Sequence, residues 1–145
     1  MTVHLIKMSV GVEDVPHLER IQAGRLADAE RQGRPLELMH VTRNMPRRAA
    51  DVLKGGSIYW VIKRFIRARQ PIIDLRQVEG KEGRMSCSIV LKPGLIRTEV
   101  RSFRAFQGWR YFAVEDVPPD APETPEGGED MPAELAVELK GLGLL

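Results

Sequence analysis

Short apolar stretches separated by polar turns run along most of this chain, and their composition is that of β-strands. Residues 57–66 (SIYWVIKRFI) are aromatic and β-branched and are apolar on both faces, which is typical of a central strand. Residues 84–92 alternate between apolar and polar positions, as a strand with one buried face does. Further strands are predicted at residues 3–10, 38–42, 70–78 and, after a turn at Pro93-Gly94, from residue 96 onward.

Two helices are predicted from apolar spacing and capping residues. Asp14 can cap a helix that runs to Arg31 and is stopped by the Gly33 and Pro35 that follow. Its apolar face is interrupted by Gln22 and Arg25 and consists of Val15, Leu18, Ile21, Leu26 and Ala29.

The second predicted helix is short. Asn44 can cap residues 46–54, and the Gly55-Gly56 pair ends them. The predicted order is a strand, a long helix, a strand, a short helix and then four or five strands. This order is typical of an α+β protein. We expect a small, partly closed, mixed or antiparallel β-barrel with one long and one short flanking helix. A flat antiparallel sheet with helices on one face is the alternative.

The composition changes after Val117, which divides the chain into three parts. Residues 1–117 form the predicted domain, and residues 118–131, rich in proline and acidic residues, form a predicted linker. Residues 132–145 follow as a tail with a short helix at 132–140. Such a helix needs a surface to pack on, either its own domain or a second copy of the chain.

Length and composition limit the class of protein. The chain has 145 residues, of which 43% are hydrophobic and 29% charged, so one soluble domain with a real core is expected. No apolar run reaches the roughly 20 residues that a membrane span needs, and the first ten residues do not resemble a secretory signal. Cys87 is the only cysteine, which excludes an intrachain disulfide, and a cytoplasmic location is expected.

Charge is distributed unevenly along the chain. Residues 1–117 carry 21 Lys and Arg against 13 Asp and Glu, a net charge of +8, whereas residues 118–145 carry −6. The guanidinium group is suited to phosphate or carboxylate ligands, so the domain is expected to contact an anion. The alternatives are that these side chains are simply solvated or that the acidic tail screens them.

Two stretches of the sequence resemble a known family. Residues 40–76 contain HVTRNMPRRAADVLKGGSIYWVIKRFIRARQPIIDLR, and residues 106–112 read FQGWRYF. Together they resemble an uncharacterised family of bacterial proteins, a domain of unknown function, over residues 3–117 with the acidic tail outside. The order of elements also resembles the core of PUA-like pseudobarrels, some of which bind RNA or modified bases. Neither resemblance implies an activity here, because fold alone is a poor guide to function.

The first candidate site is a surface on which arginines and aromatic rings alternate in the sequence. Arginine and lysine release counterions from phosphates, and aromatic faces stack on unpaired bases. For Trp60 a core position is expected, and for Trp109 both a core and a stacking role stay open. The predicted ligand-binding or nucleic-acid-binding residues are Arg43, Arg47, Arg48, Lys63, Arg67, Arg69, Arg104, Trp109 and Arg110.

A second candidate site is formed by His40, Thr42 and Arg43, which can bind an anion or transfer a proton near the end of a strand. The alternative is an ordinary strand edge. We choose His40 as the candidate for a catalytic test. Cys87 is expected to be a buried structural thiol, and no metal site, cofactor or phosphate-binding loop is predicted.

Three hypotheses on function follow. The first is a non-catalytic domain that binds an anionic partner, above all RNA or another nucleic acid. The second is a small enzyme that acts on a phosphorylated or carboxylated metabolite with His40 as acid or base. The third is a homodimer joined through the C-terminal tail. A closed pocket that contains His40 would favour the enzyme, and an open basic groove would favour the nucleic-acid binder.

Overall fold

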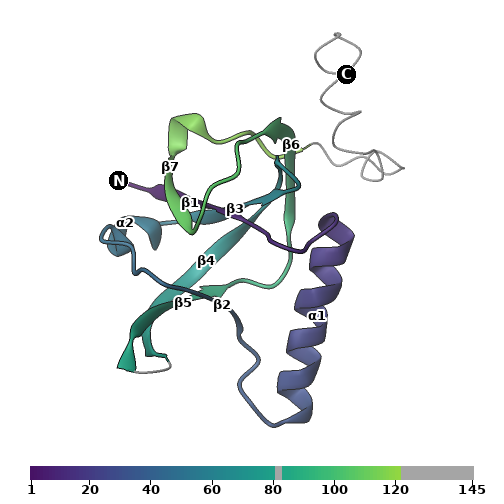
Figure 1. Ribbon diagram of the computed structural model, residues 1–145, viewed down its shortest axis with the longest axis vertical. Helices are drawn as coiled ribbons and strands as arrows, with labels where there is room; N and C mark the ends of the chain where they lie inside the picture. Colours follow the sequence, from purple (N-terminus) through teal and green to yellow (C-terminus); the bar gives the residue numbers. More distant parts are fainter. Residues whose placement is uncertain (81–82, 122–145) are drawn as a thin grey trace.

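Seven strands form one mixed sheet in the computed structural model, which describes residues 1–80 and 83–121 (Figure 1). Along the main path of the sheet the strand order is β2-β5-β4-β3-β1-β7, and β6 pairs with β4 beside this path. The strands are β1 Val3–Met8, β2 Leu38–Thr42, β3 Ser57–Ile62, β4 Phe65–Glu79, β5 Met85–Leu91, β6 Ile96–Ser102 and β7 Trp109–Ala113.

The long strand β4 connects the two halves of the sheet and crosses the molecule diagonally (Figure 1). Its first half pairs with β3 and β6, and its second half pairs with β5, which pairs with β2. The only parallel pair in the described part of the chain is β1 with β3. Register shifts in β4 at Ile66/Ala68 and Ile72/Asp74 bend the sheet, because an irregular ladder twists a strand locally.

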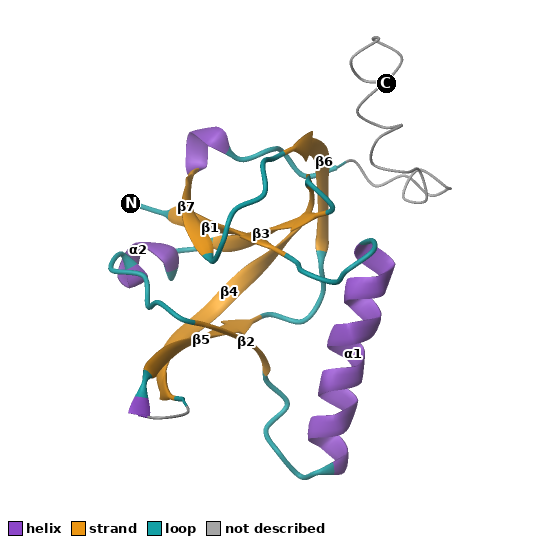
Figure 2. Ribbon diagram, in the orientation of Figure 1, coloured by secondary structure: helices purple, strands orange, loops and turns teal. Residues whose placement is uncertain are grey.

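The α+β class is confirmed, whereas the partly closed barrel is not. No pairing among the described residues joins the end strands β2 and β7, so the sheet stays open. Figure 2 shows α1, Val15–Arg31, standing alongside the sheet and joined by a loop to β2. The described chain has one further α-helix, α2 Ala49–Val52, and a 3-10 turn after β7, η2 Val114–Asp116.

The long helix has the start and the end that the sequence predicts. The Asp14 carboxylate accepts a hydrogen bond of 2.8 Å from the backbone N–H of His17, which satisfies a free donor of the first turn. Its buried residues are Val15, Leu18, Gln22 and Ala29. No helix in the described part of the chain is long and apolar enough to span a membrane.

The short helix is shorter than predicted. It covers Ala49–Val52 only, and Arg48 occupies the capping position without a side-chain hydrogen bond, so the prediction that Asn44 caps it is wrong. Close packing after this helix requires a glycine at position 56. A Cβ atom there would lie 2.3 Å from the carbonyl oxygen of Val52 and 2.6 Å from that of Val3.

The predicted strand 57–66 is a hairpin instead of one strand. Lys63 and Arg64 form the turn between β3 and β4, with φ angles of +49° and +70°. The predicted strand 70–78 is the second half of β4, so the boundary between the two lies at the turn rather than before Gln70. The region after residue 96 divides into β6 and β7.

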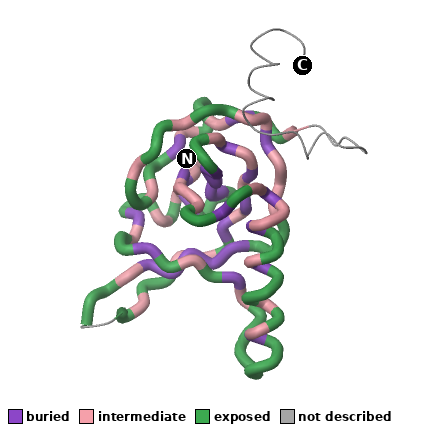
Figure 3. The backbone as a smooth tube through the Cα atoms, turned by 45° about the vertical axis from the view of Figure 1, so that its right-hand side comes forward, coloured by how far each residue is buried: buried purple, intermediate pink, exposed green. Residues whose placement is uncertain are grey.

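Two apolar clusters lie on opposite faces of the sheet. The larger faces α1, and Trp60, 3% exposed, belongs to it together with Leu5, Ile58, Ile62 and Leu91 among others. The smaller consists of Ile6, Tyr59, Val61, Ile66 and Phe112. Figure 3 shows that the free end of the β4–β5 hairpin and the C-terminal end of α1 are exposed.

The first residues of the predicted linker pack along β6. The backbone N–H of Ala121 donates to the carbonyl of Arg97 (2.9 Å), and the N–H of Glu99 donates to that of Pro119 (2.9 Å). The guanidinium of Arg69 forms two hydrogen bonds with the Asp120 carboxylate, at 2.7 and 2.9 Å. The rest of the predicted linker, the predicted helix 132–140 and the proposed tail interface lie outside the described residues.

Candidate functional site: a basic pocket between the long helix and the sheet

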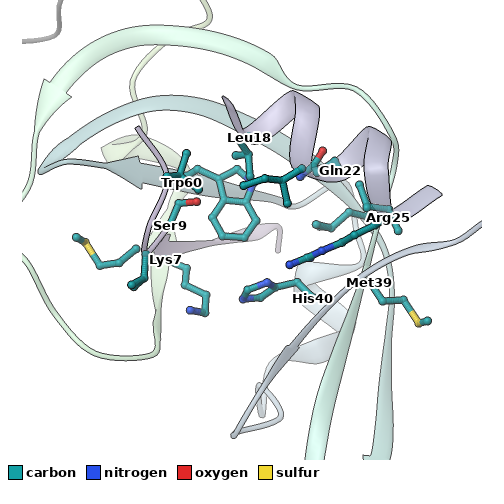
Figure 4. A pocket seen from close by; sticks show the side chains of 14 residues that line it. Lys7, Ser9, Leu18, Gln22, Arg25, Met39, His40 and Trp60 are labelled. Carbon is teal, nitrogen blue, oxygen red and sulfur yellow. The ribbon is translucent and has the colours of Figure 1, made fainter. Parts of the chain in front are cut away.

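A pocket of about 170 Å³ lies between α1 and the sheet (Figure 4). The loop after β1 contributes Ser9, Val10 and Val12 to its lining. Its lining residues come from β1 and its loop, α1, β2, β3 and β5: Lys7, Met8, Ser9, Val10, Val12, Leu18, Ile21, Gln22, Arg25, Leu38, Met39, His40, Trp60 and Leu91.

Three basic side chains meet in this pocket. Lys7 comes from β1, Arg25 from α1 and His40 from β2, and Figure 4 shows all three extending into the space in front of the Trp60 ring. None of the described residues that line the pocket is an aspartate or a glutamate. The pocket therefore carries positive charge that its own walls do not neutralise.

His40 is held in its neutral form. Burial, and next the nearby charges of Lys7 and Arg25, lower the pKa of its imidazole from 6.5 to about 4. Its Nε2 atom is shielded from solvent and has no hydrogen-bond partner within the described structure. A buried polar atom without a partner is rare and unfavourable.

Lys7 lies on the same face of the sheet as the indole of Trp60. The register of β1 places it opposite Trp60 of β3 on one side and Trp109 of β7 on the other. Burial lowers the pKa of the ammonium group, and no described carboxylate forms an ion pair with it. A lysine in this position gains from a bound anion that removes the unpaired charge.

A buried amide network fixes the inner wall of the pocket. Trp60 Nε1 donates to the side-chain oxygen of Gln70 (3.2 Å), which also accepts from the Gln22 amide (2.9 Å). The Gln70 amide donates in turn to Gln22 Oε1 (3.0 Å) and to the carbonyl of Lys92 (2.9 Å). The rings of Trp60 and His40 make a T-shaped contact, with their centroids 5.2 Å apart and their planes at 82°.

His40 and Thr42 share one face of β2, because they lie two residues apart in the strand, where they pair with Ile89 and Cys87 of β5. Arg43 lies beyond the end of β2 and does not line the pocket. Cys87 is buried, its thiol lies 3.6 Å from the sulfur of Met45, and burial raises its pKa, as a structural thiol requires. Within the described residues no group of three histidine, cysteine or acidic side chains could hold a metal ion.

Three of the nine predicted nucleic-acid-binding residues lie in the loop between β2 and α2. Arg43 and Arg47 are exposed there. Arg48 is tied to the sheet, because its backbone N–H donates to the Tyr111 hydroxyl (3.0 Å) and its guanidinium lies 5.8 Å from that ring. Its guanidinium also pairs with Asp51 (3.0 Å).

Trp109 helps to hold that loop. Its indole N–H donates to the carbonyl of Asn44 (2.9 Å), and its half-buried ring packs against the larger apolar cluster. The ring also meets Tyr111 edge-on at 5.0 Å. These contacts give Trp109 a structural role at the edge of the sheet.

Arg110 lies on the opposite face of β7 from Trp109, because successive side chains of a strand alternate. Its guanidinium lies 4.7 Å from the centre of the Phe106 ring, and Phe103 packs against Phe106 and Phe112. Arg104 is exposed beside Phe103 in the same loop. The rings of Phe103 and Phe106 pack against the smaller apolar cluster.

The remaining three residues lie on β4 and at its turn. Lys63 forms an ion pair with Glu13, Arg67 is half-buried on β4, and Arg69 is bonded to Asp120 and to the hydroxyl of Ser57 (2.9 Å). The structure thus divides the predicted surface among the β2–α2 loop, the opposite face of β7 and the β4 region. It brings together Lys7, Arg25 and His40 instead, of which the sequence singled out only His40.

The comparisons with known proteins identify a family without a known function. No curated protein and no solved structure matches the chain, so the resemblance to PUA-like pseudobarrels is not confirmed. A family model described as "Protein of unknown function (DUF1489)" matches residues 5–145. The match continues through the acidic tail, which corrects the expectation that the tail lies outside the family pattern. The chain therefore belongs to the DUF1489 family of proteins of unknown function.

Proposed function

We propose that this protein binds a small organic anion, a carboxylated or phosphorylated metabolite, in the pocket between α1 and the sheet. The observation that carries the proposal is the convergence of Lys7, Arg25 and His40 on a pocket whose described lining has no acidic residue. Lys7 and His40 are half-buried, and Arg25 is exposed at the rim. A charge in a partly buried site attracts an anion more strongly than it does in water.

His40 has a chemical role in this proposal beyond attraction. At neutral pH its imidazole is uncharged, so it has one N–H donor and one acceptor nitrogen. It can donate a hydrogen bond to an anion held by Lys7 and Arg25, or take a proton from a group next to it. Of the acid and base roles in the hypothesis of a metabolite site, this supports the base.

Binding of simple anions to the full chain tests the proposal. The protein is titrated with acetate, benzoate and inorganic phosphate while amide and indole N–H signals are followed by NMR. At least one anion should bind with shifts at the Trp60 indole, and Arg25→Met should weaken its affinity about tenfold, the effect of losing one charged hydrogen bond.

A matched control is available on the same helix. Arg20 is exposed and does not line the pocket, so Arg20→Met removes the same charge without touching the site. The affinity of Arg20→Met should stay within about twofold of the unmodified protein, since exposed charges interact weakly. Equal losses in both variants, or no anion binding at all, would contradict the proposal.

We propose nucleic-acid binding as a second candidate, supported by the arrangement around β7. Arg110 stacks on Phe106, Arg104 is exposed beside it, and Arg43 and Arg47 are exposed on the β2–α2 loop. Such side chains suit a single-stranded, negatively charged partner. RNA retention is measured at two salt concentrations, and Arg47→Glu combined with Arg48→Glu should weaken binding and flatten the salt dependence. No retention of RNA or DNA at low salt would rule this candidate out.

A further inference from the structure

The walls of the pocket select among the anions that its charges attract. We infer that the ligand is a monocarboxylate with a flat apolar group, of the size of an aromatic or short branched carboxylic acid. The inference rests on the anion site proposed above and concerns the rest of the same pocket. It is carried by the apolar lining, the volume and the position of the donors.

The part of the pocket away from the charges is apolar. Nine of its fourteen lining residues are hydrophobic, among them Leu18, Ile21, Leu38 and Trp60. Gln22 adds little polarity, because its side-chain oxygen and nitrogen are both bonded to Gln70. If a bare phosphate bound to the charges, water molecules with few hydrogen-bond partners would fill the apolar part of the pocket. An apolar group on the ligand displaces these water molecules.

The volume sets the size of that apolar group. The pocket holds about 170 Å³. An apolar protein cavity of about 150 Å³ accommodates benzene, and drug-sized ligands occupy pockets of about 300 Å³ or more. One ring or one branched chain with a carboxylate therefore fills this volume, and a nucleotide would extend beyond it.

The donors suit a carboxylate head. A guanidinium can hold both oxygens of a carboxylate through two parallel hydrogen bonds, which Arg25 is free to do at the rim. Lys7 supplies a second cation, and the His40 side chain lines the same space. Burying a dianion beside the apolar wall costs more desolvation than burying a carboxylate, so the same donors discriminate against phosphate.

The test compares four probes that separate charge from apolar bulk. Benzoate has both, acetate and inorganic phosphate have charge alone, and benzyl alcohol has the ring alone. NMR titration of the full chain follows the Trp60 indole N–H, assigned with Trp109→Phe, which removes the other indole signal. Benzoate should bind at least about tenfold more tightly than acetate, phosphate or benzyl alcohol, and Arg25→Met should remove most of its advantage over benzyl alcohol.

Each other outcome has a distinct meaning. If acetate or phosphate binds as tightly as benzoate, and this binding is lost in Arg25→Met but not in Arg20→Met, the inferred ligand class is wrong and the anion site stands. If benzyl alcohol binds as tightly as benzoate, the pocket is only an apolar cavity, and both proposals fail. If no probe shifts the Trp60 signal, both proposals fail as well.

Discussion

Gln22 of α1 and Gln70 of β4 form a reciprocal amide pair, in which each side chain donates to the oxygen of the other, at 2.9 and 3.0 Å. Gln70 is fully buried and its oxygen also accepts the indole N–H of Trp60. The pair joins the long helix to the sheet behind the pocket. Its position explains how a polar residue can interrupt the apolar face of α1 without destabilising the helix.

Replacing Gln70 with leucine should destabilise the protein. The variant leaves the Gln22 amide, the Trp60 N–H and the Lys92 carbonyl without their partner, and each buried unsatisfied group costs about 1–3 kcal/mol. After local rearrangement we expect a loss of roughly 2–4 kcal/mol in the free energy of unfolding, measured by urea denaturation. The exposed Gln77 of the same strand is the control. A loss in Gln70→Leu no larger than in Gln77→Leu would contradict the role of the pair.

The burial of His40 should make stability depend on pH. Its pKa is about 4 in the folded protein and near 6.5 in the unfolded chain, so the unfolded chain binds the proton more readily. Stability contributed by the neutral imidazole is therefore present above pH 6.5 and lost as the pH falls toward 4. The full shift corresponds to about 3 kcal/mol, and partial exposure reduces our expectation to about 2 kcal/mol.

Urea denaturation of the unmodified protein and of His40→Gln measures this effect. Between pH 7 and pH 4.5, the free energy of unfolding of the unmodified protein should fall by about 2 kcal/mol more than that of His40→Gln. The comparison is needed because burial and Arg69 also lower the pKa of His4, which is present in both proteins. Parallel pH profiles would show that His40 is not held neutral.

The Arg69–Asp120 pair should have a pH dependence of the same sign as that of His40, shifted to lower pH. The guanidinium of Arg69 holds the pKa of the Asp120 carboxyl below its usual range, so its contribution is present above about pH 4 and lost as the pH falls through the lowered pKa. Because the Asp120 side chain is 47% exposed, Asp120→Asn should cost only about 0.5–1 kcal/mol at pH 7 and almost nothing near pH 2. Urea denaturation at both values checks this, and a constant difference would contradict it.

The sequence predicted those parts of the fold that depend on local pattern. The capped helix from Asp14, the strand that contains Cys87 and the buried Trp60 all follow from spacing within a few residues. The open sheet could not be predicted in the same way. It depends on β4 having two sets of partners along its length, which is a property of distant segments.

The candidate site was predicted only in part, because its residues come from three elements. His40 stood out as a histidine near the end of a strand, whereas Lys7 was one charge within an apolar strand and Arg25 an interruption of an apolar helix face. These two charged residues were the evidence in the sequence for the other members of the site, because a charged side chain within an apolar pattern needs a partner or a function. The abundance of arginine between residues 43 and 110 pointed elsewhere, and the structure distributes those side chains over both faces of the sheet.

The turn at Lys63 and Arg64 gives a last prediction. Both residues have left-handed backbone angles, which residues other than glycine or asparagine adopt at a cost of roughly 1–2 kcal/mol each. Arg64→Gly should therefore raise the free energy of unfolding by about 0.5–1 kcal/mol, because the relief of strain exceeds the added freedom of the unfolded chain. Arg64→Ala is the matched control, since it removes the same charge and keeps the strain. Thermal and urea denaturation should rank Arg64→Gly above the unmodified protein and Arg64→Ala no higher than it; equal gains in both variants would place the effect in the charge of the side chain.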